Sequence, residues 1–444
     1  MIEEPVVIIG AGVAGLAAAY ELVKNDVPVL VLEAQKEAGG LAGSMIIGDE
    51  KIDRYYHFIC GNDNNLFELI KEIGLSSYLY WSESRTGYFQ KKKIYPFSCP
   101  VDLARFDVLP LIDRFKFGAN VLECRFRKRW DDLDKITAIE WLEKKIGKKA
   151  CSMIWEPLLR EKFGKYYKEI SAAWIWHRIN RVASSRRHIW QREKLGYLNG
   201  GTETLVKRLI EFISEKGGLV KTGREVVAII IDEMGYVKGV RLADGTIQPT
   251  SAVISTVPAP ELVRLLEYTD CIDPLAVQGM KGIPYINIIC VAMVLKKKIT
   301  DYFWLNVNAE DIPFSGIIEY SNLNKEFGKK ESHLIYIPFY VAEDDPLWNT
   351  PNEQIIEMCI SALGRIQPEF TPEWVREIVV CRDKDVQPIC GIDFRKKMLS
   401  VCGHIGRLYI TDSSRLYPED RTISGMVWLG REAAMCVIRQ CGWI

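Results

Sequence analysis

Three glycines near the N-terminus have the spacing of a dinucleotide-binding turn. Gly10, Gly12 and Gly15 form a G-x-G-x-x-G pattern, with Ala14 inside it, between a strand-like and a helix-like apolar run. Gly10 permits a tight turn, Gly12 lets the backbone approach a pyrophosphate, and Gly15 lets the helix pack closely on the sheet. The helix N-terminus offers free N–H groups to the phosphates. The pattern predicts a dinucleotide site, the alternative being the glycine turn of an ordinary α/β domain.

An acidic residue follows at the distance that this turn requires. Glu33, with Ala34 after it, ends the next strand-like run, about 20 residues beyond the glycines. A carboxylate at this place accepts hydrogen bonds from the adenosine ribose, and its charge would repel a 2′-phosphate. We therefore expect both residues to contact the adenosine.

A second glycine cluster lies just beyond the acidic residue. Gly39 and Gly40 are followed by Leu41, Ala42 and Gly43. Without a Cβ atom, glycines let the backbone run close beside the extended body of a cofactor. A simple NAD fold does not need this doublet, so the sequence favours FAD.

The same segments resemble the signature of a flavoenzyme superfamily. VVIIGAGVAGLAAAYEL and VLEAQKEAGGLAGS are similar to segments of monoamine oxidases, protoporphyrinogen oxidases and phytoene desaturases and, more distantly, of UDP-galactopyranose mutases. The resemblance covers nearly the whole chain and includes GREVVAI, ISTVP and LYITDSSRLYPEDRTISGMVWLGREAA. It implies FAD as the cofactor and a backbone contact to adenine from Val226 or Val227.

The C-terminal part of the resemblance implies contacts near the flavin. Asp412 would bind the ribityl chain, and the turn from Ile423 to Met426 would bring a helix N-terminus toward the pyrimidine ring. The dipole of that helix would stabilise an anionic reduced flavin. Thr411 stands where the family usually has glycine, which predicts a slightly different backbone here. The alternative for Asp412 is a helix-capping or turn aspartate.

The segment KIDRYYHFI lies where the chain of this family passes the flavin ring. His57 falls where the mutases carry a flavin-adjacent histidine, and a histidine there could donate to the flavin or shuttle a proton. A packed, hydrogen-bonded histidine is the alternative. Tyr55 and Tyr56 would form an aromatic wall beside the same site, or belong to the core. We take His57 and Tyr56 as the catalytic candidates.

The candidate substrate residues lie in later segments. Arg178 and Arg181, on a tryptophan-rich helix, could present forked donors to a carboxylate or pyrophosphate, or form a solvated charged face. Tyr320, near the end of PFSGIIEYSN, could face the substrate, although a strand end and turn is the preferred interpretation. The strand YINIICVAM, aligned with the one on which monoamine oxidases carry a lysine, has none, which disfavours amine oxidation.

Composition and charge limit the partners and the location. Lysine plus arginine equals aspartate plus glutamate at 58 each, so no global field favours nucleic acid. The twelve cysteines are scattered, and none has metal-ligand spacing with the five histidines, so we expect reduced cytosolic thiols and no metal. No apolar run is long enough for a membrane-spanning helix, and the acidic N-terminus is unlike a secretory signal.

Residues 102–129 form the one segment with the pattern of a surface-binding helix. Apolar positions at helical spacing are flanked by arginines and lysines. Such a helix lies on a membrane surface or packs on the cofactor domain, and we prefer the second interpretation. We therefore expect a cytoplasmic protein that could contact a membrane peripherally.

These motifs need an α/β scaffold, and the 444 residues are enough for two or three units. Strand-like and helix-like segments predict a Rossmann-like FAD-binding domain with a parallel sheet, discontinuous in sequence, over 1–77, 195–270 and 386–444. Residues 78–194 and 271–385 would form a mixed α+β substrate domain, as a helical insertion and a β-rich block. The oligomeric state is left open by the sequence.

The leading functional hypothesis is an FAD-dependent oxidoreductase, an oxidase or desaturase, that accepts a hydride from a bulky, lipophilic or anionic small molecule. A single dinucleotide fingerprint favours oxygen, a quinone or another acceptor over NAD(P). The alternatives are a non-redox sugar-nucleotide mutase, in which reduced flavin acts as a nucleophile, and a catalytically idle flavoprotein.

Overall fold

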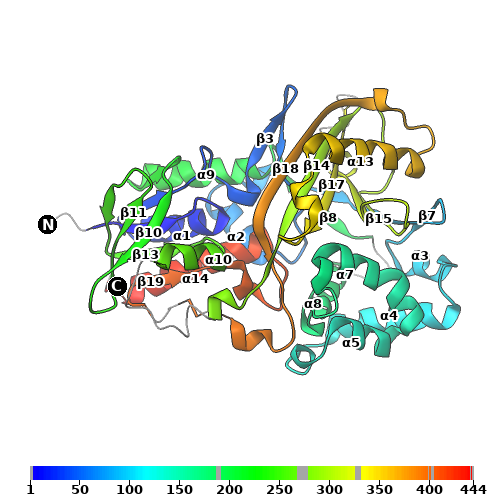
Figure 1. The fold of residues 1–444 in the computed structure, drawn as a ribbon, viewed down its shortest axis with the longest axis horizontal. Coiled ribbons are helices and arrows are strands. Elements are labelled where there is room, and N and C mark those ends of the chain that lie inside the picture. The colour runs from blue at the N-terminus through cyan, green and yellow to red at the C-terminus, as the bar shows by residue number, and fades with distance from the viewer. Residues whose placement is uncertain are drawn as a thin grey trace.

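The computed structural model describes residues 4–186, 192–267, 279–325, 332–398, 400–401, 405–440 and 442. Its elements form an α/β body that contains the N- and C-terminal segments, a second sheet, and a group of helices below that sheet (Figure 1). The predicted fold class, an α/β protein with a parallel sheet and a mixed α+β part, is confirmed. The domain boundaries stay a proposal.

A five-stranded parallel sheet forms the centre of the α/β body, in the order β19-β13-β1-β2-β9. Strands β1, β2 and β13 are buried along their whole length, and helix α1 packs against α9 and α14. A parallel sheet buried on both faces has such apolar strands. The strands are β1 (Val6–Ile9), β2 (Val29–Leu32), β9 (Leu219–Lys221), β13 (Ala252–Ser255) and β19 (Leu408–Ile410). The helices are α1 (Val13–Lys24), α2 (Asn64–Glu72), α9 (Thr202–Glu215), α10 (Ala259–Leu266) and α14 (Ile423–Gln440).

This strand order brings three distant parts of the chain to one edge of the sheet. Strand β1 pairs in parallel with β2 and with β13, and β13 pairs in parallel with β19. The carboxyl ends of the strands therefore lie together, which is where open α/β sheets bind their ligands. The turns after Ile9, Leu32, Ser255 and Ile410 begin at this edge.

The second sheet has seven strands in the order β18-β14-β17-β16-β15-β6-β7. All eleven residues of β14 are buried, and its alternate side chains enter two different apolar clusters, one of which includes helix α13 (Asn352–Ile366). The sheet is therefore covered on both faces. Its strands are β6 (Thr86–Gln90), β7 (Lys93–Pro96), β14 (Tyr285–Leu295), β15 (Trp304–Val307), β16 (Gly316–Glu319), β17 (His333–Val341) and β18 (Val375–Pro388).

The helical insertion lies below the second sheet in Figure 1. Where the sequence predicted one amphipathic segment over residues 102–129, the structure has two helices with a break between them, and α4 packs on α5 and α8. None of the helices in the described ranges is long and apolar enough to cross a membrane. The helices are α3 (Pro100–Arg105), α4 (Leu111–Phe126), α5 (Ala138–Ile146), α6 (Lys148–Ala150), α7 (Glu156–Phe163) and α8 (Ala172–Ser184).

Three small antiparallel sheets complete the fold. One is the ladder β10-β11-β12, and two strand pairs, β3 with β4 and β5 with β8, join the α/β body to the rest. The predicted strand–helix–strand unit over residues 5–33 and the predicted closing helix are both present. These strands are β3 (Ser44–Ile47), β4 (Glu50–Asp53), β5 (Leu79–Glu83), β8 (Lys194–Leu198), β10 (Val226–Ile231), β11 (Val237–Leu242) and β12 (Ile247–Pro249).

Candidate cofactor and substrate site

One large cavity joins the α/β body to the second sheet and the helical insertion. Its volume is about 1230 Å³, larger than the roughly 300–1,000 Å³ of most small-molecule sites. One end is lined by the turns at the carboxyl edge of the parallel sheet, and the other by parts of β14, β17, α4, α7 and α8. A continuous space of this kind can hold an extended cofactor and a substrate together.

The first glycine turn is shaped by close backbone contacts. Gly10 has a φ of +101°, and a Cβ atom on Gly15 would lie 2.0 Å from the carbonyl oxygen of Gly10. A Cβ on Gly12 would have no described atom within 4 Å, and Gly12 and Ala14 both line the cavity. The turn therefore leaves open space beside Gly12, which fits the pyrophosphate of a dinucleotide, whereas Gly15 serves the packing of α1.

The glycine doublet folds back onto this turn. Gly39 and Gly40 have φ angles of +119° and +56°, and the Gly39 N–H donates to the carbonyl oxygen of Ala11 over 2.8 Å. A Cβ on Gly40 would lie 3.3 Å from the Cα of Gly12. The doublet, Leu41 and Ala42 all line the cavity, so both glycine clusters border one channel.

Glu33, the predicted ribose ligand, lines the same channel. Its carboxylate accepts the N–H of Ala11 at 2.7 Å and the N–H of Gln35 at 2.9 Å. A carboxylate has about four acceptor positions, so positions remain for ribose hydroxyls. Glu33, Ala34 and Val226 line the cavity, whereas Val227 is not part of its lining. Of the two predicted adenine contacts, Val226 is the one on the cavity wall.

Asp412, the predicted ribityl ligand, has three hydrogen-bond donors within the protein. Its carboxylate accepts the N–H of Ala259 at 2.6 Å, the N–H of Ser414 at 2.5 Å and the hydroxyl of Tyr285 at 2.6 Å. The side chain is buried, and Ser413, not Asp412, lines the cavity. This is the capping geometry of the alternative interpretation. A ribityl contact by Asp412 stays a prediction.

The N-terminus of α14 points its first turn at the cavity. Ile423 and Met426 line the wall together with Thr422, whose hydroxyl accepts the N–H of Gly425 at 2.9 Å. Helix α14 has 18 residues, so its N-terminal partial charge is fully developed. This end of the cavity therefore favours a ligand atom with negative charge.

His57 and Tyr56 both line the same cavity. Burial, with the charge of Arg421, lowers the pKa of His57 to about 4, so the imidazole is neutral at pH 7. Its Nδ1 is buried and has no hydrogen-bond partner among the described residues. The Tyr56 hydroxyl lies 3.1 Å from that of Tyr340, and the Tyr56 ring meets Trp304 edge-on with centroids 5.4 Å apart. His57 thus offers a free nitrogen beside a rigid aromatic wall.

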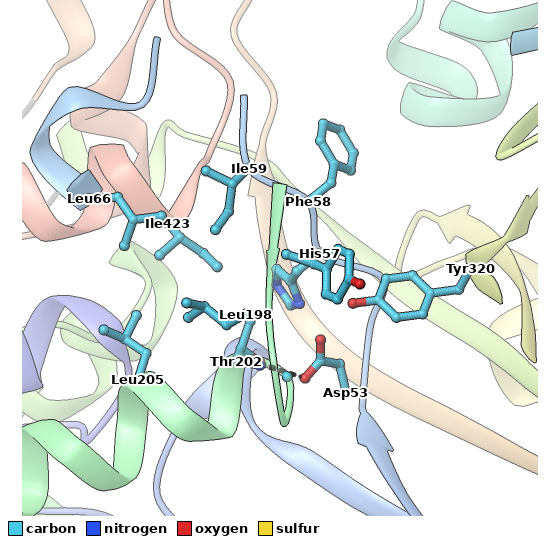
Figure 2. A pocket seen from close by; sticks show the side chains of 12 residues that line it. Asp53, His57, Phe58, Ile59, Leu66, Leu198, Thr202, Leu205, Tyr320 and Ile423 are labelled. Atoms are coloured by element: carbon cyan, nitrogen blue, oxygen red, sulfur yellow. Dashed lines mark hydrogen bonds between the residues drawn. The ribbon is translucent and has the colours of Figure 1, made fainter. Parts of the chain in front are cut away.

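Tyr320 lies in a second, much smaller cavity of about 10 Å³, drawn in Figure 2. This space is shared with His57 and with Asp53, which accepts the N–H and the hydroxyl of Thr202 at 2.9 and 2.8 Å. Burial raises the pKa of Asp53 to about 6. Tyr320 is not part of the lining of the large cavity. The structure therefore separates it from the other candidate substrate residues.

The two predicted arginines both have carboxylate partners. Arg181 donates to both oxygens of Asp63 at 3.1 Å and is buried. Arg178 lies 3.4 Å from Asp420, which also pairs with Lys162 at 2.7 Å. Burial alone would raise the pKa of Asp420, but Lys162 and Arg178 lower this pKa to about 2. Arg178 and Arg181 line the cavity as members of ion pairs.

Sequence reasoning missed several charged residues of the cavity wall. Asp420 and Arg421 line it directly before α14, so the flavin-like motif around them could have pointed to them. Lys162 is 258 residues from Asp420 in the chain, and nothing in its own segment signals that pairing. Glu161 also lines the cavity without a sequence signal.

The parallel sheet, the paired glycine turns and Glu33 together define an FAD-binding α/β protein of the dinucleotide-binding type. A family model of flavin containing amine oxidoreductases matches residues 13–384, and the chain belongs to this family. The family confirms the predicted cofactor, FAD, and the predicted class, a flavin-dependent oxidoreductase.

Curated relatives include both desaturases and oxidases. The chain is 22% identical over 392 residues to the 15-cis-phytoene desaturase of Solanum lycopersicum, covering 82% of this chain and 64% of the relative. It is 24% identical over 314 residues to a flavin-containing amine oxidase of Danio rerio, covering 67% and 58%. The matches thus span about three fifths of the length of these relatives.

Solved structures with the same fold cover nearly the whole chain. A protoporphyrinogen oxidase-like protein of Exiguobacterium sp. 255-15 gives a TM-score of 0.76 at 17% identity, over 98% of this chain and 99% of the other. A reduced UDP-galactopyranose mutase gives a TM-score of 0.76 at 18% identity, over 99% and 94%. These likenesses show the fold alone.

Proposed function

We propose that the chain is an oxidase or desaturase that passes a hydride from a bulky, mainly apolar substrate to FAD. The observation that carries this proposal is the continuity of the glycine-lined channel with a chamber walled by aromatic and aliphatic side chains. Apolar pockets of this kind bind ligands through their shape and buried area. The chamber wall includes Tyr88, Phe97, Phe117, Ile154, Trp155, Leu158, Trp174, Ile175, Trp304 and Tyr340.

The protein groups of the wall would position the substrate and keep water out. FAD, when bound, supplies the hydride acceptor. Tyr56 and Tyr340, linked through their hydroxyls, hold a fixed aromatic surface next to His57. The neutral imidazole of His57 can accept a proton or a hydrogen bond at its unpartnered Nδ1. The N-terminus of α14 would favour negative charge on the cofactor ring.

An anionic substrate and the mutase alternative both receive less support from the charged residues. Arg178 and Arg181 supported both ideas, the mutase together with His57, and each has a carboxylate partner. Arg421 lines the cavity as a further cation and is the better candidate for an acidic substrate group. No observation at the site favours a nucleotide sugar over an apolar compound.

Anaerobic reduction of the bound flavin tests the proposed function. Purified protein should be yellow, and its flavin absorption should bleach when polyenes or porphyrinogens are added, with one oxidised product per flavin. Amines and nucleotide sugars serve as comparison compounds. Conversion of a nucleotide sugar only after flavin reduction, without net electron transfer, would establish the mutase instead. A colourless protein that takes up no FAD would contradict the proposal.

We also propose that the α3–α4 surface, meaning the exposed side of residues 100–126, contacts a membrane. Its large apolar side chains are exposed, and Phe115 and Leu122 also line the cavity. Exposed apolar residues beside lysines and arginines are typical of helices that lie on anionic lipid. An apolar substrate could then enter from the lipid. The exposed residues are Val101, Leu111, Ile112, Phe115, Leu122 and Phe126.

Co-sedimentation with vesicles tests this contact. The protein should pellet with vesicles that contain phosphatidylserine, and the double variant Leu111→Asp/Ile112→Asp should stay in solution with its FAD content unchanged. Ile247→Asp is the matched control, because Ile247 is an exposed residue of β12 in the α/β body. Equal sedimentation of all three proteins would contradict the membrane contact.

A further inference from the structure

Glu161 is a carboxyl group of the cavity wall without an ion-pair partner among the described residues. It belongs to α7 and lines the cavity together with Leu158 and Leu159 of the same helix. The backbone N–H of Ser315 is close enough to lower the pKa of this carboxyl group. No lysine or arginine of the described residues forms an ion pair with it.

Other ionisable residues of the same region are differently arranged. Lys162, the next residue, pairs with Asp420 at 2.7 Å. Glu156, on the same helix but outside the cavity lining, accepts a hydrogen bond from Arg160 at 2.9 Å and one from Tyr167 at 3.2 Å. Glu161 therefore differs from its neighbours in having acceptor positions that the protein leaves open.

The fold gains nothing from a carboxylate at this position. Glu161 lies in the last turn of α7, where the helix dipole disfavours negative charge. Transfer of a charged group into apolar surroundings is costly unless it is paired. Burial raises the pKa of Glu161 to about 7, and the nearby charge of Asp345 raises this pKa further, against the lowering effect of the Ser315 N–H. A group that costs the fold in these ways is a candidate for ligand binding.

We propose that Glu161 is a specificity-determining residue that binds a hydrogen-bond donor, an ammonium or a hydroxyl group, on an otherwise apolar substrate. This inference rests on the proposed function, because it assumes that the apolar chamber holds the substrate. A carboxylate that accepts from a charged or neutral donor in a low-dielectric site forms a strong hydrogen bond. The substrate class is then an amphiphile with one donor group, rather than a pure hydrocarbon.

Three probes with the same apolar body test the inference on the FAD-loaded protein. Dodecylamine, dodecanol and dodecyl methyl ether are titrated, with calorimetry and the perturbation of the flavin absorption as readouts. The wild type should bind the amine and the alcohol more tightly than the ether. Glu161→Leu should lose about tenfold or more in affinity for both donors and none for the ether.

Two further variants separate the possible causes of a change. Glu161→Gln keeps an acceptor oxygen without the charge, so it should retain binding of the alcohol and weaken binding of the amine. Glu156→Gln, which changes a residue of α7 outside the cavity lining, should bind all three probes like the wild type. Glu161→Leu should also raise the thermal midpoint above pH 7, because it removes an unpaired charge from a half-buried position; a purely structural role for Glu161 would lower that midpoint.

The outcomes distinguish failure of this inference from failure of the proposed function. If all three probes bind the wild type equally, or if Glu161→Leu binds the amine as well as the wild type does, Glu161 has no role in specificity, while the apolar chamber is retained. If none of the probes binds to FAD-loaded protein, the apolar chamber itself is wrong and the inference is overturned with it.

Discussion

The two ends of the large cavity are built in different ways. At the cofactor end, backbone groups from neighbouring turns form the wall, as in the contact between the Gly39 N–H and the carbonyl oxygen of Ala11. At the substrate end, side chains from distant segments form it, as in the ion pair of Lys162 with Asp420. A wall of backbone has little room for added atoms, whereas a wall of side chains can change its shape while the fold persists. The cofactor end should therefore be sensitive to single atoms and the substrate end to charge and shape.

The largest expected effect is at Gly15, and Gly12 is its matched control. Gly15→Val places a Cβ atom 2.0 Å from the carbonyl oxygen of Gly10, so strand β1 and helix α1 must separate and the folded state should be lost. A Cβ on Gly12 meets no described atom within 4 Å. Gly12→Val should fold normally and lose FAD, because its side chain fills the channel. Thermal unfolding and the ratio of flavin to protein absorption measure both effects.

The same two variants can also contradict the view that backbone groups form a closely packed wall at the cofactor end. Retention of FAD by Gly12→Val would show that the channel beside Gly12 does not hold the cofactor. A stable, FAD-loaded Gly15→Val protein would show that backbone packing at this end is looser than the contacts indicate.

The cofactor end could be predicted from the sequence because its contacts are local. Gly10 and Gly39 have positive φ angles, at which other residues are strained. Glycine at these positions can therefore be recognised in the sequence. Glu33 directly follows β2 at the expected distance and lines the cavity. Backbone requirements of this kind restrict residue type at fixed spacing, so the strand–helix–strand unit and the cofactor followed from the sequence.

The substrate end could not be predicted to the same depth. Its ion pairs and hydrogen bonds join residues far apart in the chain, such as Arg181 with Asp63 and Tyr56 with Tyr340. Residue type alone does not show which partner a charged group has. The sequence therefore suggested free arginines where the structure has ion pairs, and it gave no signal for Glu161. The position of Asp412 followed a motif, but its contacts depend on Tyr285, whose side chain comes from another segment.

A smaller effect is expected from the buried pair of Arg181 and Asp63, which tests whether Arg181 belongs to the fold or to the substrate site. Asp63→Asn leaves the buried guanidinium without its charged partner, which costs about 3 kcal/mol of unfolding free energy. Adding Arg181→Met to this variant should recover part of the loss, because the unpaired charge is then removed. Denaturant unfolding of both variants measures the difference. If Asp63→Asn is as stable as the wild type, Arg181 is free to bind a ligand.

The smallest effect is expected from Asp53, in the small cavity next to His57. Burial raises the pKa of Asp53 from its ordinary value of 3.8 to about 6. The folded state thus holds a proton on Asp53 that the unfolded state has released, so this group makes stability fall as pH rises from about 4 to 6. Asp53→Asn should reduce that decline. At pH 7 its net effect should be about 1 kcal/mol or less, because the lost hydrogen bonds to Thr202 and the lost buried charge oppose each other.

Unfolding measured at several pH values checks the raised pKa of Asp53, and the binding of FAD and of apolar probes to Asp53→Asn decides where this residue belongs in the comparison of the two ends. Its contacts to Thr202, and the contact of the Thr202 hydroxyl to the carbonyl oxygen of Ala42 at 2.6 Å, tie it to the wall of the cofactor channel. Asp53→Asn should therefore weaken FAD binding slightly and leave the affinity for apolar probes unchanged. In the opposite pattern, Asp53→Asn retains FAD and its binding of the probes is altered. Asp53 would then act on the substrate end through His57. The division between a wall of backbone groups and a wall of side chains would not hold at Asp53.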